Sequence, residues 1–394
     1  MNSLKAGTEI ILTVQDLSFG DGIGRIEGQV CFIEGALPNE KVRAVVTDVK
    51  RKFIRAKLAE ILEVSPHREI PPCPYIKECG GCQYQHLSYE QELFWKEKQV
   101  KSGLERIGKV MSENFDPIMP SPKFYGYRNS ITLHQGETHG RRAWGFFKKD
   151  NVSIVKIEQC LLADESLNGQ IGNIPTEPDY RDLTSLTLRC DGEGNVYDDS
   201  DNTLFQVRID SEKLWVSSQG FFQVNLPVAG KIIERIKSWI EIGLNDELYD
   251  LHAGIGTLGL LCGQYAKMVY ASEINPLSIP ALEKNFTEKR GEKYALQPEA
   301  AEDAVKKWFT DSTEGRRVVI LNPPRAGLSP FLSGFLAKNL TLDLIIYISC
   351  DIGRWARDIN LILSQGNYRL IHVAPFDMFP RTKHIEVASC LVRK

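Results

Sequence analysis

The sequence lacks a strong net charge, a long apolar run and any repetitive or low-complexity tract. Its 394 residues carry 48 Lys and Arg against 51 Asp and Glu, a formal net charge of −3 at pH 7. That balance gives no global indication of a nucleic-acid partner, which must be sought in local patches. Charged residues interrupt every apolar stretch, so we expect no transmembrane helix and no membrane partner. The N-terminal residues have no basic stretch followed by an apolar core, so we expect no signal peptide.

Cysteine is the first informative residue type, with nine in the chain. An odd number in a long chain without a secretion signal argues against a disulfide framework and predicts a reducing, cytoplasmic location. Cys73, Cys79 and Cys82 are clustered with the spacing C-x5-C-x2-C. Three thiolates need a fourth ligand, and Cys160 is our candidate for a four-cysteine iron–sulfur cluster. Zinc held by the same thiolates stays open as an alternative, because sulfur softness alone does not separate the two.

The length is consistent with two to three domains, and residues 1–62 are predicted to form a small β barrel of the OB type. Short runs of alternating apolar residues in this part are separated by turn signals. From Lys41 to Lys57 there are seven Lys and Arg against one Asp, with Phe53 in the densest part. A basic strand with an interleaved aromatic is either an RNA-binding platform or a solvated strand face beside a core Phe.

Residues 63–215 are predicted to be a central α+β domain that begins with several prolines and the cysteine cluster. Residues 89–107 indicate one amphipathic helix. Its expected apolar face consists of Leu93, Phe94, Val100, Leu104 and Ile107. We expect strands and turns over residues 123–215, with a second group of basic residues.

Residues 216–394 alternate between strand and helix patterns. Strands are predicted at Leu248–His252, Met268–Ile274, Arg317–Asn322, Leu344–Cys350, Tyr368–Val373 and His384–Val392. Such alternation indicates an open, mostly parallel, Rossmann-like α/β sheet with a nucleotide site at the carboxyl ends of the strands.

A glycine-rich turn follows the first of these strands. Asp250 ends the strand, Gly254 and Gly256 allow close backbone approach to a ligand, and Glu273 ends the next strand. An acidic residue about 20 residues beyond such a turn commonly accepts hydrogen bonds from a ribose. The turn lacks the full Gly-x-Gly-x-x-Gly pyrophosphate pattern, which favours a cofactor without phosphates, such as S-adenosylmethionine, over NAD.

Three further residues lie at predicted strand ends or within the last strand. Asn322 opens the stiff turn Asn-Pro-Pro-Arg, and Cys350 closes a hydrophobic strand. A strand-end thiol before a helix start is a candidate nucleophile. Glu386 is an acidic residue between Ile385 and Val387, so it lies on a wet face or serves in proton transfer.

Stretches along the whole chain resemble the S-adenosylmethionine-dependent RNA uracil-5-methyltransferases, in particular the iron–sulfur type that modifies 23S ribosomal RNA. Gly20-Asp-Gly-Ile-Gly to Leu37-Pro-Asn-Glu-Lys-Val is similar to that family's RNA-binding TRAM domain. The family's cluster motif is resembled by Pro72-Cys-Pro-Tyr-Ile-Lys-Glu-Cys-Gly-Gly-Cys-Gln-Tyr-Gln-His-Leu. Its cofactor-contacting motif is resembled by Phe221-Phe-Gln-Val-Asn. Ile348-Ser-Cys-Asp and Phe379-Pro-Arg-Thr-Lys-His-Ile-Glu resemble its nucleophile and base motifs.

The resemblance implies a role for each matching residue. Cys350 is implied as the nucleophile and Glu386 as the base. The implied contacts to S-adenosylmethionine are Gln223, His252, Thr257, Glu273 and Asn322. The implied ligands of a [4Fe-4S] cluster are Cys73, Cys79, Cys82 and Cys160. The implied substrate is RNA, and 23S ribosomal RNA is favoured over transfer RNA. No obligate protein partner is implied. The helix after the cluster is implied to pack on the catalytic domain.

Two departures from the family pattern leave alternatives open. The family usually has Asp where Asn322 stands, and an aromatic and Cys where His252 and Ala253 stand. Asn keeps hydrogen bonding but loses a charge, which motivates a second hypothesis of a non-catalytic RNA-binding or assembly protein with the same fold. Asn-Pro-Pro also occurs in amino-group methyltransferases, but those enzymes need no Cys and Glu pair.

Overall fold

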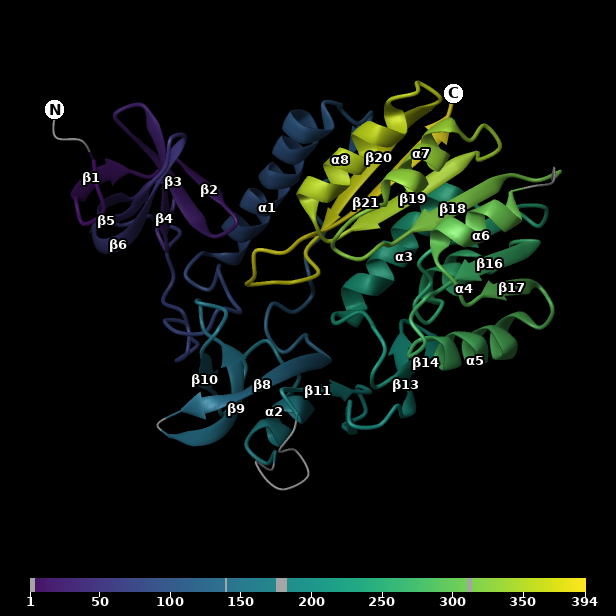
Figure 1. Cartoon of the computed structure of the whole chain (residues 1–394), viewed down its shortest axis with the longest axis horizontal. Coiled ribbons are helices and arrows are strands. Elements are labelled where there is room, and N and C mark those ends of the chain that lie inside the picture. The colour runs from purple at the N-terminus through teal and green to yellow at the C-terminus, as the bar shows by residue number, and fades with distance from the viewer. Residues whose placement is uncertain (1–3, 139, 175–182, 310–313) are drawn as a thin grey trace.

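The computed structural model describes residues 4–138, 140–174, 183–309 and 314–394. The chain forms an N-terminal β sheet, a central antiparallel sheet and a C-terminal α/β sheet, with helix α1 (Tyr89–Gly103) running between the first and the last (Figure 1). Among the described residues, no helix combines the length and the apolar character needed to cross a membrane.

The N-terminal part is the expected small β unit. Its strands are β1 (Glu9–Thr13), β2 (Asp16–Ser18), β3 (Asp21–Ile26), β4 (Gln29–Glu34), β5 (Lys41–Val49) and β6 (Phe53–Glu63). They form one sheet in the order β1-β5-β6-β4-β3-β2, and alternate residues such as Ile10, Ile33 and Val42 face its core. Phe53 is half-buried and packs edge-on against Phe32 at 5.7 Å. The side chain therefore serves the packing of the barrel while part of it remains exposed.

The central part contains a five-stranded antiparallel sheet in the order β10-β9-β8-β11-β12. The strands are β8 (Ser130–Thr138), β9 (Arg141–Phe147), β10 (Ile154–Lys156), β11 (Ser185–Cys190) and β12 (Val196–Asp198), and α2 (Glu165–Ile171) covers one side. A hairpin follows, formed by β13 (Leu204–Ile209) and β14 (Glu212–Ser217). The apolar side chains of this hairpin belong to the hydrophobic core of the C-terminal sheet.

The C-terminal part alternates strands and helices, as the apolar runs predict. The strands are β15 (Glu247–Asp250), β16 (Met268–Ser272), β17 (Tyr294–Gln297), β18 (Arg317–Leu321), β19 (Leu344–Ser349), β20 (Tyr368–Phe376) and β21 (Glu386–Arg393). The helices are α3 (Leu226–Ile240), α4 (Thr257–Cys262), α5 (Ile279–Arg290), α6 (Ala301–Trp308), α7 (Pro330–Lys338) and α8 (Ile352–Leu363). All six strands predicted for this part are confirmed, and β17 is an additional edge strand.

The order of strands in this sheet places a ligand site. The sheet runs β17-β16-β15-β18-β19-β21-β20-β7, where β7 (Asn114–Phe115) is a short addition. Strands β17 through β19 are parallel, and β21 is antiparallel to both of its neighbours. The chain leaves β15 toward β16 on one side and later returns to β18 on the other. Such a reversal of strand order opens a crevice at the carboxyl ends of the strands.

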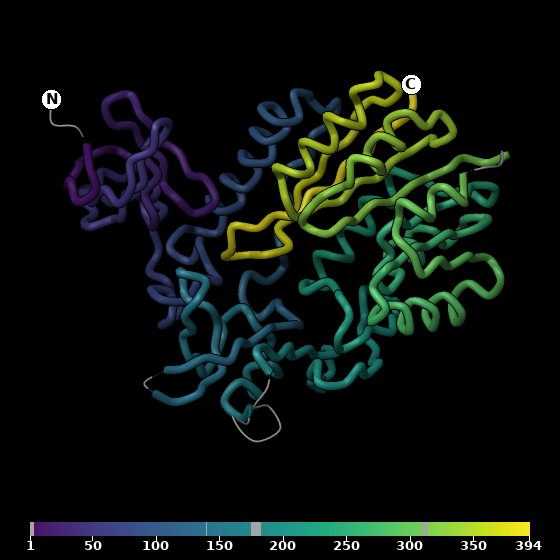
Figure 2. Tube along the Cα trace, viewed as in Figure 1, coloured from purple at the N-terminus to yellow at the C-terminus, as the bar shows by residue number. Residues whose placement is uncertain are grey.

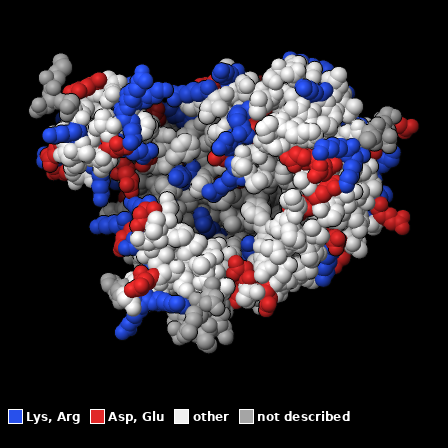
Figure 3. Space-filling model, in the orientation of Figure 1, with Lys and Arg blue, Asp and Glu red and all other residues white. Residues whose placement is uncertain are grey.

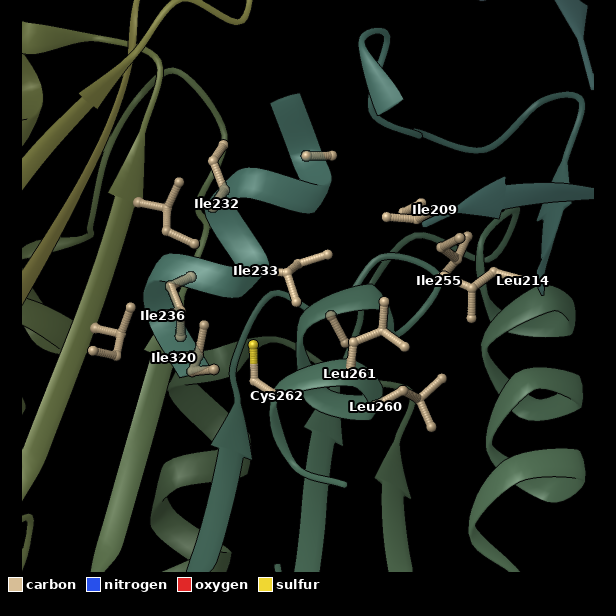
Figure 4. Packing of buried hydrophobic residues seen from close by; sticks show 14 of the residues in the cluster. Ile209, Leu214, Ile232, Ile233, Ile236, Ile255, Leu260, Leu261, Cys262 and Ile320 are labelled. Carbon is tan, nitrogen blue, oxygen red and sulfur yellow. The ribbon is translucent and has the colours of Figure 1, made fainter. Parts of the chain in front are cut away.

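Helices cover both faces of the C-terminal sheet and bury two separate hydrophobic layers. On one face Ile232, Ile233 and Ile236 of α3 pack toward Leu260 and Leu261 of α4 (Figure 4). Strands buried on both faces are apolar throughout, and β18 and β19 are buried at every residue. This burial fixes the strand ends, from which the candidate site projects.

Helix α1 differs from the sequence prediction in the face that it buries. Phe94 and Ile107, expected on the apolar face, are 54% and 46% exposed. The buried face of α1 carries Glu92, Trp95, Lys96, Gln99, Val100 and Gly103. Val100 and Leu104 are buried as predicted. The prediction missed the buried polar residues because it assumed an apolar partner throughout, whereas α1 also meets a polar loop of residues 377–384. Figure 2 shows this loop extending from the C-terminal sheet toward α1.

Candidate active site and cysteine cavity

The predicted site residues of the C-terminal part gather at one edge of its sheet. Asn322 directly follows β18 and Cys350 follows β19, while Glu273 follows β16. Strands β16 and β18 flank β15, and β19 lies beside β18. All are parallel, so their carboxyl ends meet at one edge. Glu386 opens the antiparallel β21, which places it at the same edge beside the end of β19.

The glycine turn after β15 is fixed by Glu273. One carboxylate oxygen of Glu273 accepts a hydrogen bond from the Gly254 amide at 2.7 Å, and the other accepts from the Asn275 amide at 2.6 Å. A Cβ atom at Gly256 would lie 2.5 Å from the ring of Phe286, and φ of Gly256 is +88°, so only glycine fits there. A Cβ atom at Gly254 would meet open space, which leaves room above the turn for a ligand.

Two buried polar atoms at this turn lack a partner among the described residues. Asp250 is fully buried, and its Oδ2 accepts from the Gly259 amide at 2.8 Å while Oδ1 has no partner. Burial raises the pKa of Asp250 to about 7. Nδ1 of His252 also has no partner, and burial lowers the pKa of His252 to about 4, which keeps the ring neutral. Unpaired polar atoms are costly inside a protein, so these two atoms fit a site that a polar ligand completes.

The other expected cofactor contacts border the same turn. Thr257 is buried and begins α4 directly after Gly256. Gln223 lies in the loop before α3, and its carbonyl oxygen accepts from Asn129 Nδ2 at 3.0 Å. A Cβ atom at Gly220 in that loop would lie 3.2 Å from Ser278 Oγ, so the loop lies against the segment that follows Glu273.

Cys350 and Glu386 form a charged cluster with Arg325. Ser349 pairs with Val387 across β19 and β21, so the next pair in this register is Cys350 with Glu386. Burial raises the pKa of the Cys350 thiol and the Glu386 charge adds to that rise, while Arg325 donates a hydrogen bond to the thiol and opposes it. Burial raises the pKa of Glu386 to about 8, again against the charge of Arg325. A thiol and a carboxyl beside one cation can serve as a nucleophile and a base at near-neutral pH.

Arg325 is the functional residue that sequence reasoning missed. It lies three residues after Asn322 in a loop that α8 holds in place. Asp358 is fully buried in α8, and its Oδ2 accepts from the Leu328 amide at 2.9 Å, while Arg357 donates to the Leu328 carbonyl at 3.1 Å. The sequence could have indicated Arg325 because it lies in a proline-containing loop directly after the apolar strand β18. The next strand, β19, ends directly before Cys350.

The four expected metal ligands lie around one cavity outside this sheet edge. Cys73, Cys79, Cys82 and Cys160 all line a cavity of about 80 Å³. Its remaining walls are largely apolar, and none of the four thiols is in a disulfide. Burial raises the pKa of Cys82 to about 12 and also raises the pKa values of Cys79 and Cys160, whereas the charge of Arg128 lowers all three. Within the described part of the chain, no three His, Cys, Asp or Glu side chains are grouped so that they could hold a metal ion.

Known proteins match this chain over nearly its whole length. Residues 4–59 match the TRAM domain family, and residues 199–394 match the tRNA (uracil-5-)-methyltransferase family. A relative from Bdellovibrio bacteriovorus, described as an uncharacterized RNA methyltransferase, is 32% identical over 97% of this chain and 95% of its own. A second such relative, from Thermosynechococcus vestitus, is 28% identical over 99% of both chains.

A solved structure shares the fold of the full chain. The tRNA (uracil-54, C5)-methyltransferase of Pyrococcus abyssi, in complex with S-adenosyl-L-homocysteine, superimposes with a TM-score of 0.71. The match covers 97% of this chain and 100% of the other at 20% sequence identity. The arrangement of all three parts is therefore one that a known protein also adopts.

Proposed function

The chain belongs to the RNA uracil-5-methyltransferase family, and we propose that it methylates C5 of one uridine in 23S ribosomal RNA through a covalent adduct on Cys350. The observation that carries this mechanism is the cluster of Cys350, Glu386 and Arg325 at the sheet edge. The ribosomal substrate rests on the four-cysteine set, since it is the iron–sulfur type of the family that the cysteine motif resembles. Transfer RNA is the second candidate, favoured by the fold match.

The proposed chemistry needs a nucleophile and a base because C5 of uracil is a weak carbon nucleophile. The Cys350 thiolate adds to C6, and the new S–C bond makes C5 enolate-like. C5 then attacks the methyl group of S-adenosylmethionine, whose S–CH3 bond breaks to release S-adenosylhomocysteine. Glu386 then accepts the C5 proton, and the C6–S bond breaks to release methylated uracil and the thiolate. Arg325 stabilises the thiolate, whose pKa it lowers, before attack and after elimination. The target base must leave its stack to reach this edge.

We assign the space above the glycine turn to S-adenosylmethionine, which supplies a methyl group on a sulfonium. The Glu273 carboxylate, held by two backbone amides, retains lone pairs that can accept a ribose hydroxyl. Gln223, His252, Thr257 and Asn322 are the proposed further contacts of S-adenosylmethionine. Asn322 retains the ability to hydrogen-bond but carries no charge.

RNA is the substrate. We propose that the TRAM domain and the protein surface around the candidate active site bind it. Figure 3 shows a hollow on the viewed face, with Lys and Arg side chains around it.

We propose three domains, residues 1–62, 63–215 and 216–394. The hairpin β13–β14 packs on the last of them and contributes to its core.

We propose that Cys73, Cys79, Cys82 and Cys160 bind a [4Fe-4S] cluster. Four thiols line one cavity, yet no three of these described side chains are placed to hold a single ion. Each iron of a [4Fe-4S] cluster takes its own thiolate, so four thiols that line one cavity match the number of protein ligands that a cluster needs. The Arg128 charge, which lowers the pKa values of Cys79, Cys82 and Cys160, favours the thiolate forms that ligation requires.

Replacing Cys160 by serine is expected to remove most of the iron from protein purified without oxygen, together with its visible absorbance. Cys190→Ser is the matched control, because Cys190 lies in the central sheet but does not line the cavity. Iron and sulfide analysis of both variants checks the assignment. Full iron content in the Cys160 variant contradicts it.

The rate of turnover is expected to rise with pH from 6.5 to 8. Burial raises the pKa of Glu386 to about 8, and below that value the carboxyl is protonated and cannot accept the C5 proton. The raised pKa of the Cys350 thiol acts in the same direction, since only the thiolate attacks. We expect kcat to increase roughly tenfold over this interval. A profile that stays flat from pH 6.5 to 9 contradicts the assigned base.

Nucleoside mass spectrometry tests the proposed substrate. The purified protein is incubated with S-adenosylmethionine and unmodified transcripts of 23S ribosomal RNA and transfer RNA in separate reactions. We expect 5-methyluridine in the ribosomal transcript alone. Product in transfer RNA alone overturns the ribosomal assignment, and product in neither despite bound cofactor favours a non-catalytic role.

A further inference from the structure

We propose that Gln83 and Arg381 are positioning residues for Glu386, so that the segment after Cys82 sets the geometry of proton removal. This inference rests on the proposed function of Glu386 as the base. The segment that follows the third cysteine and the loop of residues 377–384 before β21 form one hydrogen-bonded unit. Neither residue touches the reacting atoms. Both fix the conformation of the loop that leads to Glu386.

The backbone contacts between the two segments are direct. The amides of Gln83 and Tyr84 both donate to the Arg381 carbonyl, at 3.0 and 3.1 Å. The Gln83 side chain accepts from the Lys383 amide at 3.0 Å and donates to the Gly80 carbonyl at 2.7 Å. Gln83 therefore links the cysteine loop to a residue three positions before Glu386.

Arg381 holds the loop from its other side. Its φ of +66° is unfavourable for a side chain of this size, so the surroundings must impose that conformation. Its amide donates to Glu92 Oε1 at 2.7 Å, and its guanidinium donates to the Leu87 carbonyl at 2.8 Å. The guanidinium also lies over the ring of Phe124 at 4.8 Å, with Tyr89 and Tyr125 slightly farther away. The side chain is 3% exposed.

A buried ion network fastens the same loop to α1. Lys96 Nζ is fully buried and lies 2.7 Å from both Glu92 Oε1 and Asp377 Oδ1. It also donates to the Phe379 carbonyl at 3.1 Å, and Tyr89 donates to Asp377 Oδ2 at 2.8 Å. Buried charges hold the loop at Asp377 and Arg381, and Gln83 holds it at Lys383, so α1 and the cysteine segment determine how it approaches Glu386.

The test uses the covalent adduct, which separates attack by Cys350 from proton removal by Glu386. With ordinary uridine RNA, a misplaced base slows elimination, so the adduct between protein and methylated RNA accumulates during turnover. We expect Gln83→Ala to lower kcat about tenfold or more and to raise the adduct fraction, with the Kd for S-adenosylmethionine unchanged. RNA containing 5-fluorouridine traps the adduct without proton removal, and there Gln83→Ala is expected to match the wild type.

Three variants make the outcomes distinct. Gln83→Glu is the conservative control, because it retains the acceptor for the Lys383 amide and loses only the donor to Gly80, and we expect it to accumulate less adduct than Gln83→Ala. Glu386→Gln is the reference for a missing base. If Glu386→Gln accumulates adduct and Gln83→Ala does not, the positioning role is overturned and the proposed function stands. If Gln83→Ala loses trapping with 5-fluorouridine, its role is general folding and the inference is overturned. If Glu386→Gln itself accumulates no adduct, the assigned base and this inference fail together.

Discussion

Replacing Cys350 by alanine is expected to abolish 5-methyluridine formation while leaving the affinity for S-adenosylmethionine unchanged. The thiol lies at the end of β19, beside Glu386 and hydrogen-bonded by Arg325, whereas the expected cofactor contacts follow β15, β16 and β18. Removing a nucleophile that acts as one unit with its base costs on the order of 10⁴-fold or more in rate. Methyl transfer to RNA and cofactor binding by calorimetry check the two halves of the expectation.

The matched control for this prediction is Cys390→Ala. Cys390 is fully buried in β21, the strand that Glu386 opens, and takes no part in the charged cluster. It is expected to retain activity apart from a cost in stability from the small cavity that is left. Substantial product from Cys350→Ala would exclude covalent catalysis at this position and would leave amino-group or direct methylation to be considered.

Replacing Glu386 by glutamine is expected to lower turnover by about 10²- to 10⁴-fold. The amide is nearly isosteric but cannot accept the C5 proton, so attack and methyl transfer proceed and elimination stops. The protein is therefore expected to remain bonded to its RNA, as a band that resists denaturing electrophoresis. No such band, with turnover equally reduced, would place the role of Glu386 before the adduct.

The same substitution is expected to stabilise the folded protein at high pH. Burial raises the folded-state pKa of Glu386 from 4.5 to about 8, so its contribution to stability is present below pH 4.5 and is lost as pH rises through 8. Glutamine stays neutral, and the difference in free energy of unfolding between variant and wild type is expected to grow by a few kcal/mol, roughly, between pH 5 and 9. Thermal unfolding of both proteins across this range measures the difference.

Much of the C-terminal sheet is predictable from the sequence because its strands are buried on both faces. Runs such as Leu344–Ser349 are apolar at nearly every residue, so they can be recognised as strands without knowledge of the strands that they pair with. Because these strands are parallel, the residues that follow them lie at the same edge of the sheet. That is why Asn322 and Cys350 could be placed at this edge of the sheet before any geometry was known.

The parts that sequence reasoning missed depend on contacts between distant segments. Arg325 meets a thiol 25 positions later, and no local pattern marks that meeting. Part of the buried face of α1 was missed because Lys96 and Glu92 are charged, and their burial depends on Asp377, nearly 300 residues away. The cavity of the four cysteines likewise joins Cys160 to a cluster about 80 residues earlier in the chain.

Trapping the protein on RNA that contains 5-fluorouridine is the most direct test of the central claim. Fluorine at C5 cannot be removed as a proton, so an adduct that has formed on C6 persists after methyl transfer. Mass spectrometry of the digested complex is expected to find the methylated fluorouridine on the peptide containing Cys350, and none with Cys350→Ala. Methylated RNA released free of protein, with no modified cysteine peptide, would contradict the covalent mechanism.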